Sequence, residues 1–182
     1  MLSRQIQRKR KSRGFTLIEL LIVVAIIGLV ASIIIPNLLD ALQKAKQKRT
    51  LADMREVGGA WFSWLTDQVG AASAGQQVFD FDFGSLISAE ALQSTLFPSS
   101  TFFYIQSVPK FDGWGGSFEY RLRAADLQDF PVMGIRSGGR DKSTSTDSYP
   151  VGPFISTDYD QDLVWVDGYF INYPAGSQTG NF

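Results

Sequence analysis

The 182-residue sequence contains no cysteine and no histidine. The lack of cysteine excludes a disulfide scaffold, a zinc site built on thiolates and a cysteine nucleophile, and the lack of histidine excludes a catalytic triad with an imidazole base. Carboxylate chemistry and metal sites built from oxygen ligands remain open. Because 45% of the residues are hydrophobic and 19% are charged, the chain is not a disordered polymer, and its length suits one domain of ordinary size.

Acidic residues are missing from the first 14 positions, which carry six arginines and lysines. Residues 15–69 carry five basic and five acidic side chains, whereas residues 70–182 carry thirteen acidic and six basic ones. A basic segment that precedes an apolar run stays on the cytoplasmic side of a membrane. We therefore expect a single-pass protein whose acidic C-terminal part lies outside the cytoplasm. This acidic part is not expected to bind nucleic acid.

An apolar run of 21 residues extends from Phe15 to Ile35, and about 20 apolar residues are enough to span a bilayer. A cleaved signal peptide is disfavoured, because its apolar core is shorter and small residues follow it, whereas Pro36 and Asn37 follow this run. A plain membrane anchor explains the length but not Glu19. A carboxylate costs about 2.5–3.5 kcal/mol near the middle of a bilayer helix, and less toward its end.

The stretch Gly14-Phe15-Thr16-Leu17-Ile18-Glu19, between the basic segment and the apolar run, closely resembles the cleavage site of type IV prepilins and the related pseudopilins. The resemblance implies that prepilin peptidase cuts between Gly14 and Phe15 and methylates the new amine of Phe15. A glycine suits the cleavage position, because a residue without Cβ lets the backbone enter a narrow active site in an extended form. The mature chain would then begin with its own transmembrane helix.

Glu19 gains a partner under this interpretation, since the resemblance implies that it meets the Phe15 amine of a neighbouring subunit. Two opposite charges about 4 Å apart attract by about 4 kcal/mol at an effective dielectric constant near 20. That attraction roughly offsets the cost of the carboxylate in lipid, so Glu19 would favour a helical homopolymer and set its axial register. A glutamate that merely points at lipid head groups is the alternative.

The spacing of apolar residues predicts a helix from Phe15 to Val69. Gly28 and Pro36 should interrupt it, because proline removes one helix hydrogen bond. The resemblance implies that the segment between them can unwind when subunits enter a filament, and an ordinary kink is the alternative. The apolar stripe of the second half consists of Leu38, Leu42, Ala45, Leu51, Met54, Gly58, Trp61 and Leu65. Gly58 and Gly59 mark either close packing on the head or a weak point.

The remaining residues predict a small head in which strands dominate. A second helix is predicted over 85–96, with Ser85 as its N-cap, and Asp167-Gly168 predicts a tight hairpin turn. The strands are predicted over 102–105, 117–123, 132–135, 163–166 and 169–173. The expected fold is α+β and pilin-like, a long N-terminal helix packed on a small antiparallel sheet. Its parts are a leader (1–14), a transmembrane and assembly helix (15–36), an amphipathic helix half (37–69) and a globular head (70–182).

Two stretches of the head narrow the resemblance to the major pseudopilin of type II secretion systems. Phe111–Tyr120, with the sequence FDGWGGSFEY, is similar to the D-x-W-G segment of those proteins, which also lack a C-terminal cysteine pair. The stretches around 137–147 and 156–165 are similar to the acidic loop with which they bind calcium. Calcium takes six to eight oxygen ligands. The resemblance implies a calcium site at Asp141, Asp158, Asp160 and Asp162, although Arg140 could neutralise these acids itself.

The preferred function is structural, a subunit of a type II secretion pseudopilus that serves protein export. Its implied partners are copies of itself, prepilin peptidase, the inner-membrane assembly platform and minor pseudopilins. The subunit would lie in the bacterial inner membrane, with its head in the periplasm or outside the cell. A true type IV pilus for motility, adhesion or DNA uptake is the alternative. An anchored enzyme using carboxylates is disfavoured, because the sequence carries no further catalytic constellation.

Overall fold

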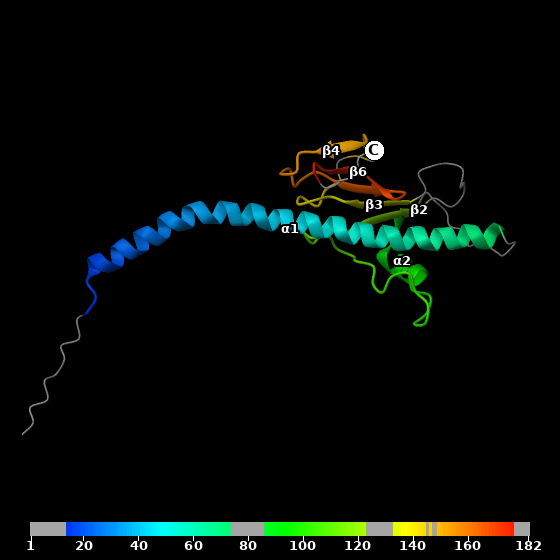
Figure 1. Cartoon of the computed structure of the whole chain (residues 1–182), viewed down its shortest axis with the longest axis horizontal. Helices are drawn as coiled ribbons and strands as arrows, with labels where there is room; N and C mark the ends of the chain where they lie inside the picture. Colours follow the sequence, from blue (N-terminus) through cyan, green and yellow to red (C-terminus); the bar gives the residue numbers. More distant parts are fainter. Residues whose placement is uncertain (1–13, 74–85, 123–132, 145, 147–148, 177–182) are drawn as a thin grey trace, which may run out of the picture. The chain divides into compact units, whose positions relative to one another are not determined.

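The computed structural model of the chain describes residues 14–73, 86–122, 133–144, 146 and 149–176. The chain divides into two compact units, Met1–Asp40 and Ala41–Phe182. The first helix, α1, extends from Leu17 to Ser73 and therefore belongs to both units (Figure 1). The predicted long helix is thus confirmed, with ends that differ by a few residues. The predicted leader lies outside the described residues, except for Gly14.

The part of α1 in the first unit is apolar and exposed. Among the described residues, α1 is the helix that is long and apolar enough to cross a membrane, and its most apolar window has a mean hydropathy of 3.0. The helix is continuous through Gly28 and Pro36, so the predicted interruption is wrong for this chain on its own. Proline removes a single hydrogen bond. The side chain of Asn37, next to Pro36, donates to the carbonyl oxygen of Ile33 at 3.2 Å.

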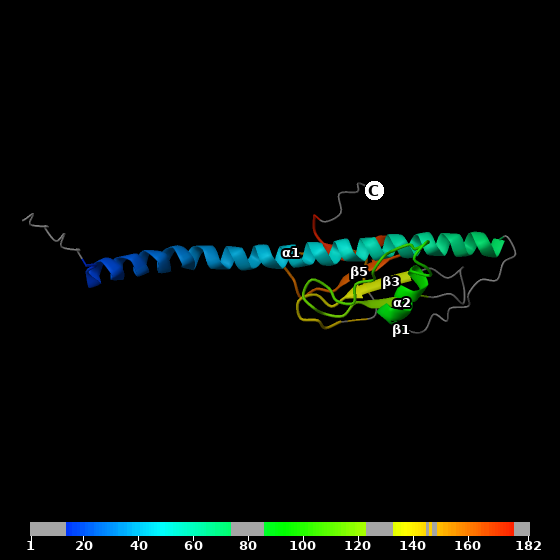
Figure 2. The ribbon, with the colours of Figure 1, turned by 90° about the horizontal axis from the view of Figure 1, so that it is seen from below.

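In the second unit, the described residues form a six-stranded sheet with the order β1-β2-β3-β5-β6-β4. Its strands are β1 (Leu86–Ile87), β2 (Glu119–Leu122), β3 (Met133–Ser137), β4 (Gly152–Phe154), β5 (Leu163–Val166) and β6 (Tyr169–Pro174). Neighbouring strands are antiparallel, except that β4 runs parallel to β6. In the view of Figure 2, the sheet and the second helix, α2 (Ala89–Leu96), both lie below the C-terminal half of α1.

The core lies between the sheet and one stripe of α1. The buried stripe repeats at helical spacing and consists of Gln47, Thr50, Leu51, Met54, Val57, Trp61 and Trp64. The predicted stripe was wrong at its beginning, because Leu38, Leu42 and Ala45 are exposed. Side chains of α1 become fully buried only from Gln47 onward, so Leu38, Leu42 and Ala45 gain no cover from the sheet.

The strands β2, β3, β5 and β6 confirm four predicted strands, with shifted ends and with Arg123 and Val132 outside the described residues. The hairpin turn between β5 and β6 is also confirmed. Asp167 and Gly168 have φ values of 46° and 102°, as a two-residue turn with the right twist requires. Asp167 also accepts a hydrogen bond from Met133 N at 2.7 Å, which ties the turn to β3.

Two predictions in the head need correction: the start and N-cap of the second helix, and one strand. The helix itself is confirmed and ends at Leu96 as predicted, whereas Ser85, its predicted N-cap, lies outside the described residues. The second helix, α2, spans Ala89–Leu96 and its N-cap is Ser88, whose hydroxyl accepts from Ala91 N at 3.1 Å. The preceding Leu86–Ile87 instead pairs with β2. The predicted strand 102–105 is irregular. Its aromatic residues serve ring packing, since the Phe102 and Tyr104 rings lie 5.1 Å apart.

Candidate functional site

Gly14, Phe15 and Thr16 lie just before α1 and are exposed. Thr16 caps the helix together with Glu19. One carboxylate oxygen of Glu19, Oε2, accepts from Thr16 N and from Thr16 Oγ1, both at 2.8 Å, and Glu19 N donates to Thr16 Oγ1 at 3.3 Å. This reciprocal arrangement is a capping box. The sequence interpretation missed it, although the T-x-x-E spacing was a signal for it.

The remaining predicted assembly residues have no packing role in the described chain on its own. A Cβ atom added at Gly28 would meet no heavy atom within 4 Å. Pro36 lies inside α1, and the large apolar side chains next to both residues are exposed, among them Ile27 at 61% and Ile35 at 53%. Cleavage after Gly14 and the assembly roles of Glu19, Gly28 and Pro36 therefore stay predictions.

The segment FDGWGGSFEY forms a tight turn around a buried carboxylate. Asp112 is 4% exposed. Its Oδ1 accepts from Trp114 N and Gly116 N, both at 2.8 Å, and its Oδ2 accepts from Ser137 Oγ at 2.6 Å. Hydrogen bonds between the backbone atoms of Asp112 and Gly116 and of Gly115 and Asp112 close the turn. Asp112 thus joins the segment before β2 to the end of β3.

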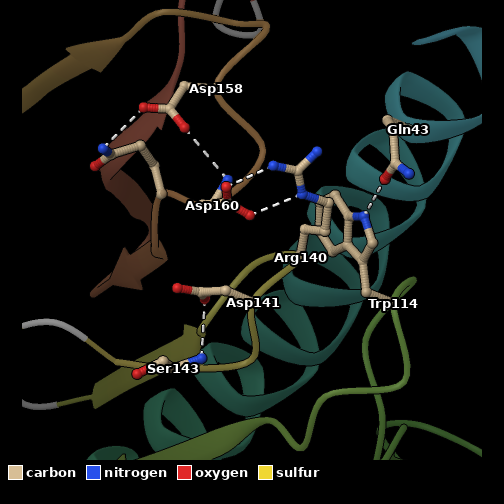
Figure 3. A network of polar contacts seen from close by, with 8 residues as sticks. Gln43, Trp114, Arg140, Asp141, Ser143, Asp158 and Asp160 are labelled. Carbon is tan, nitrogen blue, oxygen red and sulfur yellow. Dashed lines mark hydrogen bonds and ion pairs between the residues drawn. The ribbon is translucent and has the colours of Figure 1, made fainter. Parts of the chain in front are cut away.

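The same turn docks on α1. Gly113 N donates to Thr50 Oγ1 at 2.9 Å, and Trp114 Nε1 donates to Gln43 Oε1 at 2.7 Å, the latter visible in Figure 3. A Cβ atom at Gly113 would collide with the carbonyl oxygen of Lys46, so the position requires glycine. The sequence identified this segment as a family motif, but neither its turn nor its partners on the helix, because nothing local marks Gln43 or Thr50 as acceptors.

Three of the four predicted calcium ligands lie in two adjoining loops (Figure 3). Asp160 accepts from Arg140 twice, from Nε at 2.8 Å and from an Nη atom at 2.5 Å. Asp141 Oδ1 accepts from Ser143 N at 3.0 Å. Asp158 accepts from Asp160 N at 3.4 Å and from the side chain of Gln161 at 3.0 Å. The hydrogen bond with Arg140 holds the pKa of the Asp160 carboxyl below its usual value.

Asp162, the fourth predicted ligand, belongs to a different network. It is 2% exposed and accepts from Tyr149 OH at 2.6 Å. Arg136 donates to Tyr149 OH at 3.1 Å and pairs through Nε and an Nη atom with Glu119, at 3.0 and 2.5 Å. The network connects β2, β3 and the segments that flank β4. The sequence interpretation missed Glu119, Arg136 and Tyr149, which are far apart in the chain.

This network raises the pKa values of two of its side chains, Arg136 and Tyr149. Burial disfavours the charged guanidinium of Arg136, but hydrogen bonds with Glu119 and Tyr149 raise its pKa above the usual range. Burial and the hydrogen bond to Asp162 raise the pKa of Tyr149 to about 12. At neutral pH the network therefore holds a fixed positive charge and a neutral phenol, which suits a structural role.

The described carboxylates do not fit a calcium ion in this arrangement. Within the described ranges, no three acidic side chains group closely enough to hold a metal. Asp160 is engaged by Arg140, and Asp162 is engaged by Tyr149. Asp147, in the segment between β3 and β4 that also contains Asp141, lies outside the described residues. Calcium binding stays a prediction.

Comparison with known proteins agrees with the motif at the N-terminal end of the chain. Residues 9–35 match the prokaryotic N-terminal methylation motif. The type II secretion system core protein G of Escherichia coli K12 is 30% identical over 108 residues, which cover 59% of this chain and 70% of that protein. The protein of the same description from Vibrio cholerae serotype O1 is 28% identical over 144 residues, covering 77% and 90%.

A pilin is also similar to the chain. The type IV major pilin protein PilA of Myxococcus xanthus is 41% identical over 58 residues, which cover 32% of this chain and 26% of that protein. No solved structure gives a significant match. The similarity to the secretion proteins is more extensive, because it covers most of their length as well as most of this chain. The chain therefore belongs to the family of the type II secretion system core protein G, the major pseudopilins.

Proposed function

We propose that this chain is a structural subunit of a type II secretion pseudopilus, cut after Gly14 and polymerised through its N-terminal helix to serve protein export. The main support is the extent of the similarity, which covers 90% of the core protein G from Vibrio cholerae. The likeness to a type IV pilin covers only 32% of this chain. A pilus for motility, adhesion or DNA uptake is therefore the less favoured function.

The exposed part of α1 supports polymerisation on physical grounds. Large apolar side chains from Leu17 to Leu39 are about half exposed or more, and burying apolar surface stabilises by about 25 cal/mol per Å². Such a surface needs either lipid or other helices around it. Lipid would cover it in a membrane-anchored subunit, and the helices of neighbouring subunits would cover it in a filament.

The proposal includes a cellular location and partners. The apolar helix has the properties of a membrane anchor, and the basic leader would orient it with its N-terminus in the cytoplasm. The bacterial inner membrane is the expected location. Prepilin peptidase, an inner-membrane assembly platform and minor pseudopilins are the expected partners, and the acidic head is not expected to bind nucleic acid.

Intact-mass measurement of purified filaments tests the processing step. We expect a subunit that begins at Phe15 and carries one methyl group. The Gly14→Val variant should accumulate as the longer precursor in the membrane, because the side chain obstructs the extended backbone at the cleavage position. Filaments built from subunits that retain residues 1–14 would refute the proposal.

A gene deletion in the native host separates export from the alternative function. Loss of secreted proteins from the medium, with normal surface motility and DNA uptake, is expected. Complementation with the unaltered gene should restore secretion, whereas the Gly14→Val gene should not. Normal secretion together with lost motility would show that the chain serves a pilus instead.

A further inference from the structure

The loop after β3 and the loop before β5 lie backbone to backbone. Arg140 N donates to the carbonyl oxygen of Tyr159 at 2.8 Å. A Cβ atom at Gly139 would lie 2.7 Å from that oxygen and 2.8 Å from the carbonyl oxygen of Gln161. Gly139 also has a φ of 68°, so two independent constraints require glycine there. The approach of the two loops is therefore built into their backbones.

Arg140 places a positive charge at this junction. Its guanidinium engages both carboxylate oxygens of Asp160, at 2.8 and 2.5 Å. Hydrogen bonding with Asp160, followed by the charges of Asp158 and Asp141, raises the pKa of Arg140. Arg140 thus pairs with Asp160 and is further stabilised as a cation by the negative charges of two other aspartates. Such a planar, two-pronged pair gives a defined geometry that a lysine cannot reproduce.

We propose that the Arg140 guanidinium takes the place of a divalent cation at this junction, and that it fastens the two loops without a metal. A calcium ion needs six to eight oxygen ligands, but Arg140 occupies both oxygens of Asp160, and Asp162 is buried against Tyr149. The head would then not need calcium for its stability. This inference stands independently of the filament function.

A second set of hydrogen bonds, around Tyr149, also holds the loop after β3 without a metal. The loop that begins at Arg140 is also tied down at Tyr149, through Asp162 on one side and Arg136 on the other. Arg136 further donates to the carbonyl oxygen of Thr146 at 2.7 Å. The loop is therefore held near both of its ends by side chains of the chain itself.

The test compares the full chain in detergent micelles with its Arg140→Gln and Arg140→Lys variants. Each is studied with chelator, with millimolar calcium and with millimolar magnesium as an ionic-strength control. For the unaltered chain, we expect a melting temperature that changes by no more than about 1 °C on calcium addition. Arg140→Gln should melt a few degrees lower with chelator and recover with calcium but not with magnesium, because three carboxylates then lack their cation.

Amide hydrogen exchange reports directly on the junction. Arg140→Gln should accelerate exchange about threefold or more in residues 138–143 and 156–161, with little change in α1, because local opening does not require global unfolding. Arg140→Lys should give an intermediate acceleration, since it keeps the charge and loses the fork. If Arg140→Gln does not fold, Asp160→Asn breaks the same pair and should accelerate the same segments.

Three results would overturn the proposal. The first is a clear rise in the melting temperature of the unaltered chain with calcium but not with magnesium, which would show that a metal fastens the loops. The second is unchanged exchange in both loops of a folded Arg140→Gln or Asp160→Asn variant. The third is an Arg140→Gln variant that shows no response to calcium.

Discussion

At Gly58, α1 packs closely against Trp165 of the sheet. A Cβ atom there would lie 2.5 Å from Trp165 Cζ2. We expect Gly58→Ala to lower the free energy of unfolding by about 1–3 kcal/mol through overpacking, despite the better helix propensity of alanine. Denaturant unfolding of the full chain in detergent measures this change in the free energy of unfolding.

The neighbouring Gly59 provides the matched control for that substitution. A Cβ atom at Gly59 would meet nothing within 4 Å, so Gly59→Ala should stabilise the helix by up to about 1 kcal/mol. Equal stability of the two variants would contradict the packing seen at Trp165.

Asp112 organises the turn before β2 through three hydrogen bonds. We expect Asp112→Ala to cost about 2–4 kcal/mol, because it leaves buried donors unsatisfied. Asp112→Asn should be milder, since its carbonyl oxygen still accepts from the two backbone amides and the Ser137 hydroxyl can rotate to accept from its amide. Thermal unfolding followed by tryptophan fluorescence distinguishes the two. An equal loss of stability in Asp112→Ala and Asp112→Asn would show that the negative charge, and not the hydrogen bonds, holds the turn.

At the scale of elements, Thr50 joins α1 to this turn. Its hydroxyl accepts from Gly113 N and donates to the carbonyl oxygen of Lys46. We expect Thr50→Val to cost about 1–3 kcal/mol, because valine keeps the shape and removes the acceptor. Amide exchange at Gly113 should accelerate in the same variant.

Thr66→Val is the matched control on the same helix. The Thr66 hydroxyl donates only within the helix in the contacts described, to the carbonyl oxygen of Phe62, and its side chain is exposed. Removing this hydroxyl should leave both the free energy of unfolding and the amide exchange rate at Gly113 nearly unchanged. If Thr50→Val behaves like Thr66→Val, the hydrogen bond to Gly113 does not fasten the turn.

At the scale of the whole molecule, Glu19 has two roles that substitutions can separate. Glutamine also completes a capping box but carries no charge, so Glu19→Gln should insert, be cleaved and start its helix normally, yet fail to form filaments. Thr16→Val removes the cap and keeps the charge, so it should still assemble, with a frayed helix start. Electron microscopy of cells that express each variant measures assembly.

Glu19→Val completes this series, because it removes the charge and the cap together. It should still insert and be cleaved, and it should form no filaments. Filaments from Glu19→Gln, with none from Thr16→Val, would show that the helix start matters and the charge pair does not. A glutamate that only faces lipid head groups would then be the better interpretation.

The sequence by itself determined the features that depend on neighbours a few residues apart. The long helix, the hairpin at Asp167-Gly168 and the strand β5 could all be predicted, since helix and hairpin patterns are local. The close packing at Gly58 was one of two open alternatives. The capping box of Thr16 and Glu19 is equally local, and its T-x-x-E spacing is enough to predict it.

The tertiary structure decided everything that depends on partners distant in the chain. Leu86–Ile87 became a strand because β2 offered it a free edge. The aromatic residues at 102–105 packed as rings, although their apolar run had predicted a strand. Of the four aspartates predicted as one site, Asp160 pairs with Arg140 at the surface, whereas Asp162 is buried and pairs with Tyr149. Charge and spacing can be seen in a sequence, but which donor reaches which carboxylate is set by the fold, because a hydrogen bond requires contact within about 3 Å.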